Sequence, residues 1–464
     1  MRPRIVLILP SVRDQKSFPR RRVPSGLLSI AAAIVQTAAV KVEILDVETL
    51  GWSVEETVQF LSNRNPNVIG ISVCSPAYFV TQGLMKAIRA AMSSSIIVLG
   101  GKHISHCWQD VLAENAEVDA VVVGEGEVAL STIGQLATNE GYLNREIIAS
   151  TVGHLPNVIV NGFPKPVAFP PTYDLASAPP RPFECLIPTI DFYLGDKMLI
   201  EYSRGCRGAC TYCLASKYLR SISFRNTSGV VKELEHLSSL GFKDFFFTDD
   251  DFASSPEMVA ALCRGIIEAN LEIEFDANVR PDSLIKCDHV AKLMFNAGCR
   301  ALWIGIETGN RSIAKSYRKG FNLDCCKDAL AVAFRASRIA RTNWIFGSPL
   351  ESEESINDST RLANELRSVG PHLPHASFLI PYKGTEVYRQ ALELGLIDTK
   401  RINAGVWLTH DRPVMPSIHL SRESLHELYV RFHRDLYPQS FLTSLDERTL
   451  DEAMLILRSA RIDG

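Results

Sequence analysis

Three cysteines lie close together in the stretch Glu201-Tyr202-Ser203-Arg204-Gly205-Cys206-Arg207-Gly208-Ala209-Cys210-Thr211-Tyr212-Cys213, directly after a short apolar run. The spacing C-x3-C-x2-C gathers three thiols on one loop and predicts a metal site. Zinc sites usually take four ligands with paired cysteines, so a set of three favours another metal, although a zinc half-site has similar spacing. Three cysteines on a cubane iron–sulfur cluster leave one iron without a protein ligand, and that iron can bind a substrate.

The sequence around this loop, from residue 195 to about 395, alternates short apolar runs with stretches of helical length. Such alternation predicts parallel strands joined by helices, and six strands predict a partial (β/α)6 barrel. The cysteine loop follows the first strand. Helices are expected at 230–240, 256–269, 287–297 and 323–337, and strands at 198–202, 245–248, 273–277, 301–306, 342–346 and 376–380.

The ends of the later strands carry segments that resemble one family, the radical S-adenosylmethionine (SAM) superfamily. They are 247–252 (F-T-D-D-D-F), 277–282 (A-N-V-R-P-D), 303–309 (W-I-G-I-E-T-G), 345–351 (I-F-G-S-P-L-E) and 380–385 (I-P-Y-K-G-T). Leu350 replaces a glycine of the family pattern, and Lys383 replaces a proline. With the cysteine spacing, and with the likeness of the N-terminal half described below, the resemblance spans essentially residues 1–400.

This resemblance implies a [4Fe–4S] cluster held by Cys206, Cys210 and Cys213, with SAM chelated to the open iron. It implies reductive cleavage of SAM to methionine and a 5′-deoxyadenosyl radical, with an electron donor such as flavodoxin, ferredoxin or another reductase. The candidate catalytic residues are Tyr212, Glu307 and Glu351. The residues expected at SAM are Tyr212, Asp249, Asp250, Arg280, Glu307, Gly347 and Pro381.

The first 140 residues contain five runs rich in Val and Ile, separated by amphipathic stretches. This order predicts a doubly wound parallel sheet, whose ligands lie beyond the carboxyl ends of the strands. The expected strands are 5–9, 42–45, 68–73, 96–99 and 120–123, and the expected helices are 26–37, 53–62, 81–93 and 106–114.

Segments in this half resemble the cobalamin-binding (B12) domain that precedes the barrel in one large radical SAM class. They are 23–28 (V-P-S-G-L-L), 44–46 (I-L-D), 99–103 (L-G-G-K-H) and 123–127 (V-G-E-G-E). The resemblance implies Gly100, Gly101 and His103 as cofactor-binding candidates. The D-x-H-x-x-G motif, which supplies a histidine to cobalt in other B12 proteins, is absent. Cobalamin therefore stays an open possibility, and His103 is either a cobalt ligand or a hydrogen-bonding loop residue. The run 20–22 (R-R-R) either contacts an anionic group or is solvated.

We therefore expect an α/β chain in four parts. A B12-binding-like Rossmann domain occupies residues 1–144 and a Pro-rich linker occupies 145–194. A radical SAM partial barrel occupies 195–395, and a small helical C-terminal region occupies 396–464.

Composition excludes several classes of protein. The 464 residues carry a formal net charge of -3, which offers no basic field for a nucleic-acid partner. No run approaches the roughly 20 apolar residues of a membrane span, and the N-terminus lacks the apolar core of a signal peptide. We expect a cytoplasmic protein without a membrane partner, in which the eight cysteines outside the loop are small buried side chains rather than disulfides.

Three functions fit these observations. The main expectation is hydrogen abstraction from a small molecule, such as a sugar or antibiotic precursor, followed by dehydration or deoxygenation of a polyol such as an aminoglycoside. The alternative is a cobalamin-dependent radical SAM C-methyltransferase of natural-product biosynthesis. The third is an iron–sulfur protein without turnover. Dehydration needs an acid or base near the substrate, and Tyr212, Tyr218, Asp250, Glu307 and Glu351 are the candidates.

Overall fold

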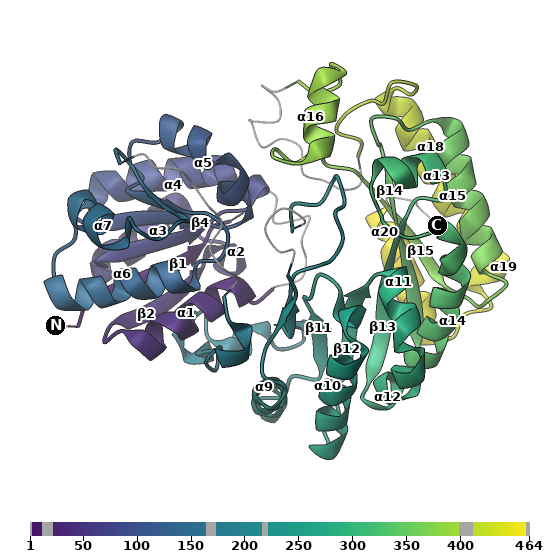
Figure 1. The fold of residues 1–464 in the computed structure, drawn as a ribbon, viewed down its shortest axis with the longest axis horizontal. Coiled ribbons are helices and arrows are strands. Elements are labelled where there is room, and N and C mark those ends of the chain that lie inside the picture. Colours follow the sequence, from purple (N-terminus) through teal and green to yellow (C-terminus); the bar gives the residue numbers. More distant parts are fainter. Residues whose placement is uncertain (1, 12–21, 164–172, 216–220, 399–411, 461–464) are drawn as a thin grey trace. The chain divides into compact units, whose positions relative to one another are not determined.

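The structure, a computed structural model, describes the whole chain except residues 1, 12–21, 164–172, 216–220, 399–411 and 461–464. The described residues form two compact units (Figure 1). The first unit runs to Leu199 and includes the short segment Ser239–Phe242, and the second contains Ile200–Ser238 and the described residues from Lys243 onward. None of the described helices has the length and apolar character needed to cross a membrane.

The first unit is built on a seven-stranded sheet with the order β6-β5-β4-β3-β1-β2-β7. All neighbouring strands are parallel except β5 and β6. The strands are buried on both faces, which explains their continuous apolar sequence; for example, Ile5, Val6, Leu7 and Ile8 are at most 1% exposed. The strands are β1 (Arg4–Leu9), β2 (Lys41–Asp46), β3 (Val68–Ser72), β4 (Ile96–Gly100), β5 (Ala120–Val122), β6 (Val158–Val160) and β7 (Leu186–Ile187).

Helices of this unit pack against one another in pairs, α1 with α6 and α3 with α4. Right-handed crossovers in this strand order place the two pairs on opposite faces of the sheet. The strand order reverses between β1 and β3, and ligands of doubly wound sheets bind at such a reversal. The helices are α1 (Ser25–Thr37), α2 (Val47–Leu50), α3 (Val54–Arg64), α4 (Tyr78–Ala91), α5 (Lys102–Glu114), α6 (Glu127–Glu140) and α7 (Arg145–Val152).

The five strands expected in the first 140 residues are confirmed, with bounds that shift by one or two residues. The two edge strands were not expected, because β6 and β7 lie in the segment 145–194 that the sequence predicts as a linker. These strands have three and two residues, too few for a periodic pattern to reveal them. The part of this segment that the structure describes thus completes the first sheet at both edges.

The second unit contains a six-stranded sheet with the order β15-β14-β13-β12-β11-β8. The pairings from β11 to β15 are parallel, and helices connect the strands, so the partial (β/α)6 barrel is confirmed. Its strands are β8 (Met198–Ile200), β11 (Asp244–Phe247), β12 (Glu274–Val279), β13 (Cys299–Glu307), β14 (Ile339–Phe346) and β15 (Leu373–Phe378).

Helices join these strands and continue into a helical C-terminal region (Figure 1). The connecting helices are α9 (Thr227–Ser239), α10 (Pro256–Glu268), α11 (Pro281–Leu284), α12 (Ala291–Asn296), α13 (Arg311–Ser316), α14 (Cys326–Ala336) and α15 (Glu353–Leu366). The helices after β15 are α16 (Glu386–Glu393), α18 (Arg422–Leu436), α19 (Gln439–Leu442) and α20 (Glu447–Ser459).

A buried network of charges ties α20 to the strands. The pairing of β12 with β13 skips Arg300, and the side chain of Arg300 binds Asp276 with an Nε to Oδ1 distance of 2.9 Å. Glu452 of α20 lies 3.7 Å from Arg300 Nη1 and 3.4 Å from Arg341 Nη1. The Arg341 guanidinium lies 4.2 Å above the ring of Trp303. The last helix is therefore part of the barrel's packing.

Candidate active site

The cysteine loop begins at a pair of short strands after β8. β9 (Ser203–Arg204) leads into the loop and pairs antiparallel with β10 (Ser223–Phe224). Gly205 turns the chain out of β9 with a φ of +107°, which favours glycine. Its N–H donates to Asp250 Oδ2 at 3.2 Å. The start of the loop is thus fixed to the end of the neighbouring strand β11.

The far side of the loop is held by backbone and hydroxyl contacts with two helices. Thr211 N donates to the carbonyl of Tyr317 at 3.1 Å, and Thr211 Oγ1 donates to the carbonyl of Ser316 at 3.0 Å, both at the end of α13. Val387 N of α16 donates to the carbonyl of Thr211 at 3.1 Å. These contacts fix the position of the loop between Cys210 and Cys213.

The chemistry of the three cysteines fits a cubane cluster, in which three thiolates bind three irons and leave one iron open. All three are free thiols, with Cys210 buried and Cys206 and Cys213 half-buried. Gly208 N donates to Cys206 Sγ at 3.3 Å, a type of contact that tunes iron–sulfur clusters. In the described ranges no three His, Cys, Asp or Glu side chains are arranged to hold a single metal ion. A cubane does not need this convergence, because each cysteine binds a different iron.

An arginine covers the buried cysteine. Arg280 follows β12 and places Nη1 4.0 Å from Cys210 Sγ, while Nη2 donates to the carbonyl of Lys319 at 2.7 Å. Asp282 binds its Nε at 3.0 Å. A Cβ at Gly208 would lie 2.7 Å from Arg280 Nη1, so only glycine leaves room for the guanidinium there. Arg280 thus places positive charge against the cysteine loop.

The acidic segment after β11 binds the backbone that leads into the cysteine loop. Asp249, which is 1% exposed, accepts hydrogen bonds from Tyr202 N at 3.0 Å and Ser203 N at 2.6 Å. Burial raises the pKa of Asp249 to about 7. Asp251 accepts from Arg280 N at 3.1 Å. All three carboxylates accept from backbone N–H groups, Asp249 and Asp251 from buried positions and Asp250 from an exposed one.

Glu307 and Tyr212 are brought together by a lysine that the sequence analysis did not single out. Lys319 Nζ lies 3.2 Å from Glu307 Oε1 and 3.3 Å from the hydroxyl of Tyr212. The Lys319 side chain is 4% exposed and lies 5.3 Å from the centre of the Phe321 ring. No sequence motif marks the segment 318–321 (R-K-G-F), so burial of its lysine was not evident.

Backbone strain sets the direction of Glu307. Its φ is +72°, unusual for a residue with a side chain, and the pairing of β13 with β14 shifts between Gly305 and Glu307. A Cβ at Gly305 would lie 2.5 Å from Glu307 Oε1. The bulge and the missing side chain at Gly305 turn this carboxylate toward Lys319. Strained backbone of this kind often occurs at functional sites.

Glu351 and Gly347 stabilise the turn after β14. Glu351 Oε2 accepts from Gly347 N at 3.2 Å and from Ser348 N at 3.3 Å, and Oε1 accepts from Ser355 Oγ. Glu351 is 1% exposed, and burial raises its pKa to about 7. One oxygen is therefore engaged by the turn and the other by the first turn of α15. Pro381, also buried, lies in the turn between β15 and α16.

The candidate cofactor residues of the first unit surround the end of β4. A Cβ at Gly101, whose φ is +96°, would lie 2.7 Å from the carbonyl of Val73, so this glycine is needed by the fold itself. His103 Nδ1 lies 3.1 Å from Ser75 Oγ, and its ring lies 4.3 Å from that of Tyr78. These contacts support the interpretation of His103 as a hydrogen-bonding residue.

The same edge leaves room for a ligand at other positions. A Cβ built on Gly124 would meet no atom within 4 Å, and one on Gly100 would come no closer than 3.9 Å to another residue. Gly100 ends β4 and Gly124 follows β5, so both lie at the carboxyl edge of the sheet. Doubly wound sheets bind their ligands at this edge. The open space at these two glycines leaves room for a ligand to approach the backbone at this edge. Arg22 of the run 20–22 is exposed, while Arg20, Arg21 and Tyr218 lie outside the described residues.

Sequence comparison identifies both units. Residues 20–134 match the B12 binding domain, and residues 200–363 match the radical SAM superfamily. An uncharacterized methyltransferase of Pyrococcus horikoshii is 24% identical over 94% of this chain and 92% of its own length. The anaerobic magnesium-protoporphyrin IX monomethyl ester cyclase of Synechocystis is 22% identical, covering 85% of this chain and 78% of its own. The bacteriochlorophyllide d C-12(1)-methyltransferase of Chlorobaculum tepidum is 24% identical, covering 92% and 86%.

Solved structures share the fold of most of the chain. The radical SAM methyltransferase TsrM of Kitasatospora setae, with cobalamin and a [4Fe–4S] cluster bound, matches with a TM-score of 0.69 and 18% identity, covering 85% of this chain and 78% of its own. The cobalamin-dependent radical SAM enzyme OxsB matches with a TM-score of 0.72 and 16% identity, covering 99% and 71%. The chain therefore belongs to the radical SAM superfamily, in the class of enzymes that carries a B12-binding domain before the barrel.

Proposed function

We propose that this protein is a cobalamin-dependent radical SAM methyltransferase that moves a methyl group from SAM to a carbon atom of a small molecule. The observation that carries the proposal is the presence of both a B12 binding domain and a radical SAM domain in a chain that aligns over 94% of its length with a relative named as a methyltransferase. The open space at Gly100 and Gly124 supports it, because both glycines lie at the carboxyl edge of the first sheet, where doubly wound sheets bind their ligands.

The expected main outcome, dehydration of a polyol, is not supported. The relatives described above are named as methyltransferases or as a cyclase, and the names of the two solved structures mention cobalamin. The alternative in the sequence analysis, methylation, agrees better with these names. The chain lacks the D-x-H-x-x-G motif for a cobalt-binding histidine, and His103 is engaged by Ser75 and Tyr78, but the open space at Gly100 and Gly124 depends on neither feature.

The cofactors of the superfamily are a [4Fe–4S] cluster and SAM. When bound, the cluster supplies the electron that cleaves SAM, and cobalamin supplies a carrier for the methyl group. Cys206, Cys210 and Cys213 would hold the cluster, with Arg280 beside Cys210 as a nearby positive charge. Glu307 and Tyr212, joined by Lys319, would form the polar wall toward SAM. Asp249 and Glu351 would position the turns on which these residues lie.

The proposed assignment of catalytic roles differs among the three candidates. Glu307 and Tyr212 lie together beside the cysteine loop, so they can contact SAM or substrate. Glu351 is a positioning residue, because both its oxygens bind its own turn and the next helix. Asp250 is exposed next to the loop, and because Gly205 N binds only its Oδ2, its Oδ1 can contact the amino group of SAM. A sugar or antibiotic precursor remains the proposed substrate class.

Product analysis tests the proposal. The protein, reconstituted with iron, sulfide and cobalamin, is incubated with SAM, dithionite and candidate substrates, and products are measured by mass spectrometry. Methylation consumes two molecules of SAM, one giving S-adenosylhomocysteine and the other 5′-deoxyadenosine and methionine. Equal amounts of both nucleoside products support the proposal. 5′-Deoxyadenosine without S-adenosylhomocysteine would favour dehydration, and neither product would favour an iron–sulfur protein without turnover.

A further inference from the structure

We propose that a basic pocket beside the cysteine loop docks an acidic one-electron carrier protein, which reduces the cluster. The inference rests on the proposed function, because reductive cleavage of SAM consumes one electron, which the cluster must receive from a donor. In the step itself one electron passes from the reduced carrier to the cluster, with no bond made or broken and no proton transferred.

The pocket is formed by one continuous segment that follows β13. Its volume is about 490 Å³. Four of its nine lining residues are cationic, and none is a carboxylate. The lining residues are Arg311, Ala314, Lys315, Arg318, Lys319, Gly320, Phe321, Asn322 and Leu323.

This pocket lies one side chain away from a cluster cysteine. Phe321 lines the pocket, and the guanidinium of Arg280 lies 5.6 Å from the centre of its ring. The same guanidinium places Nη1 4.0 Å from Cys210 Sγ. The backbone carbonyl of Lys319, which also lines the pocket, accepts a hydrogen bond from Arg280 Nη2. Electron transfer slows steeply with distance, so a carrier seated here would have a short route to the cluster.

Two of the four cations carry charge that no neighbour neutralises. Arg311 binds Asp324 and Lys319 binds Glu307. Lys315 and Arg318 are exposed, and neither makes an ion pair within the described part of the chain. Arg318 has a φ of +51°, an unusual conformation for a residue with a side chain. A surface with unpaired positive charge attracts an acidic partner over several ångströms.

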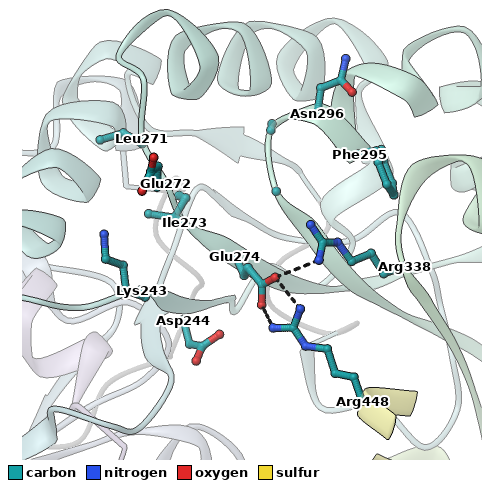
Figure 2. A pocket seen from close by; sticks show the side chains of 12 residues that line it. Lys243, Asp244, Leu271, Glu272, Ile273, Glu274, Phe295, Asn296, Arg338 and Arg448 are labelled. Atoms are coloured by element: carbon teal, nitrogen blue, oxygen red, sulfur yellow. Dashed lines mark hydrogen bonds and ion pairs between the residues drawn. The ribbon is translucent and has the colours of Figure 1, made fainter. Parts of the chain in front are cut away.

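A second pocket of the same unit provides the contrast. It lies at the amino ends of the strands, where Glu274 binds Arg338 and Arg448 (Figure 2). Its volume is about 460 Å³, and it carries three cations and three carboxylates. Charge is therefore balanced at this end of the barrel, while the pocket beside the cysteine loop is purely cationic. The difference favours the cationic pocket as the docking site for an acidic carrier.

The experiment measures binding and electron transfer separately. A reduced bacterial flavodoxin, an acidic flavin protein, is mixed with the reconstituted protein, and cluster reduction is followed by stopped-flow absorbance. Binding of oxidised flavodoxin is measured by fluorescence anisotropy at low and high salt. We expect the double variant Lys315→Glu/Arg318→Glu to bind at least ten-fold more weakly and to accept electrons at least ten-fold more slowly. Its reduction by dithionite should be unchanged, because dithionite needs no docking surface.

The matched control is Lys243→Glu/Lys292→Glu, which reverses two exposed cations of the same unit at and near the other pocket. It should bind flavodoxin as the unsubstituted protein does. Unchanged binding in the Lys315→Glu/Arg318→Glu variant would overturn the proposal, as would equal losses in both variants. A change confined to the KM for a substrate would also overturn it, and would identify the pocket as part of the substrate site. Failure of the unsubstituted protein to cleave SAM with dithionite would instead contradict the proposed function, while flavodoxin binding remained measurable.

Discussion

At the scale of single residues, Lys319 connects three segments that the sequence identifies separately. Its ammonium group contacts Glu307 of β13 and Tyr212 of the cysteine loop, and its carbonyl accepts from Arg280 after β12. A buried ammonium is costly without such partners. Lys319 thus positions the residues proposed to face SAM.

Lys319→Met tests this positioning role. We expect the KM for SAM to rise about ten-fold, a loss of roughly 1.4 kcal/mol, because Glu307 and Tyr212 lose their common partner. The iron content should stay unchanged, since no cluster ligand is altered. The unpaired Glu307 carboxylate should also destabilise the second unit. The double variant Lys319→Met/Glu307→Gln should recover that stability but not the affinity for SAM. A Lys319→Met variant with unaltered affinity for SAM would contradict the role.

Glu351 gives the second unit a pH-dependent stability. Its pKa is raised from 4.5 to about 7 in the folded chain, so between these values the folded state holds a proton that the unfolded state has released. Stability therefore falls as the pH rises through this range, by up to about 3 kcal/mol for this group. Glu351→Gln mimics the protonated carboxyl and should remove the part of the pH dependence of stability that Glu351 contributes. Denaturant unfolding at several pH values measures the free energy of unfolding of each variant. The control variant Glu354→Gln, at an exposed position, should keep the pH dependence of the unsubstituted protein.

At the scale of elements, α20 is a structural part of the barrel rather than a terminal appendage. Glu452 is the only carboxylate of α20 that contacts the buried arginines in the described structure, pairing with both Arg300 and Arg341. Asp276, fully buried on β12, also pairs with Arg300. The Glu452 carboxylate of α20 therefore neutralises arginines on two strands, β13 and β14.

Glu452→Leu should destabilise the second unit strongly. Removing one partner of a buried ion pair costs about 3–5 kcal/mol, because the remaining charges stay buried. The exposed Asp451→Leu on the same helix should change stability by less than about 0.5 kcal/mol. Thermal unfolding followed by circular dichroism measures both variants. Equal stability of the two variants would mean that solvent reaches the arginines and replaces the pairing.

At the scale of the whole molecule, the two units carry separable chemistry. The proposed cobalamin edge lies in the first unit and the cluster cysteines lie in the second. We expect about four irons and one cobalamin per reconstituted chain, with one cluster assigned to the three cysteines. Without cobalamin, 5′-deoxyadenosine should still form with dithionite, while S-adenosylhomocysteine should not. The variant Cys206→Ser should lose the cluster and both products but keep its cobalamin. Loss of cobalamin in this variant would contradict the separation.

Sequence patterns predicted the architecture because both sheets are built from long buried strands. Runs such as 5–9 and 96–99 are continuous and apolar, and the structure confirms the strands there. The edge strands β6 and β7 were not predicted, because two or three residues are too few to show a periodic pattern. Their pairing is decided by the neighbouring strand. Within the site, the residues with a family-like motif were found, while Lys319 was not.

The sequence by itself placed Cys206, Cys210 and Cys213 on one loop and predicted a metal site there, since their spacing is local and needs no distant contact. Only the tertiary structure decided what the strand-end residues do. Asp249 and Glu351 looked like groups that face SAM or substrate, but their carboxylates bind backbone N–H groups that folding brings within reach. No sequence motif marks Lys319, but the bulge at Glu307 and the approach of Tyr212 bury it. A motif specifies which residues are present, whereas burial and strand register decide which partner each one meets.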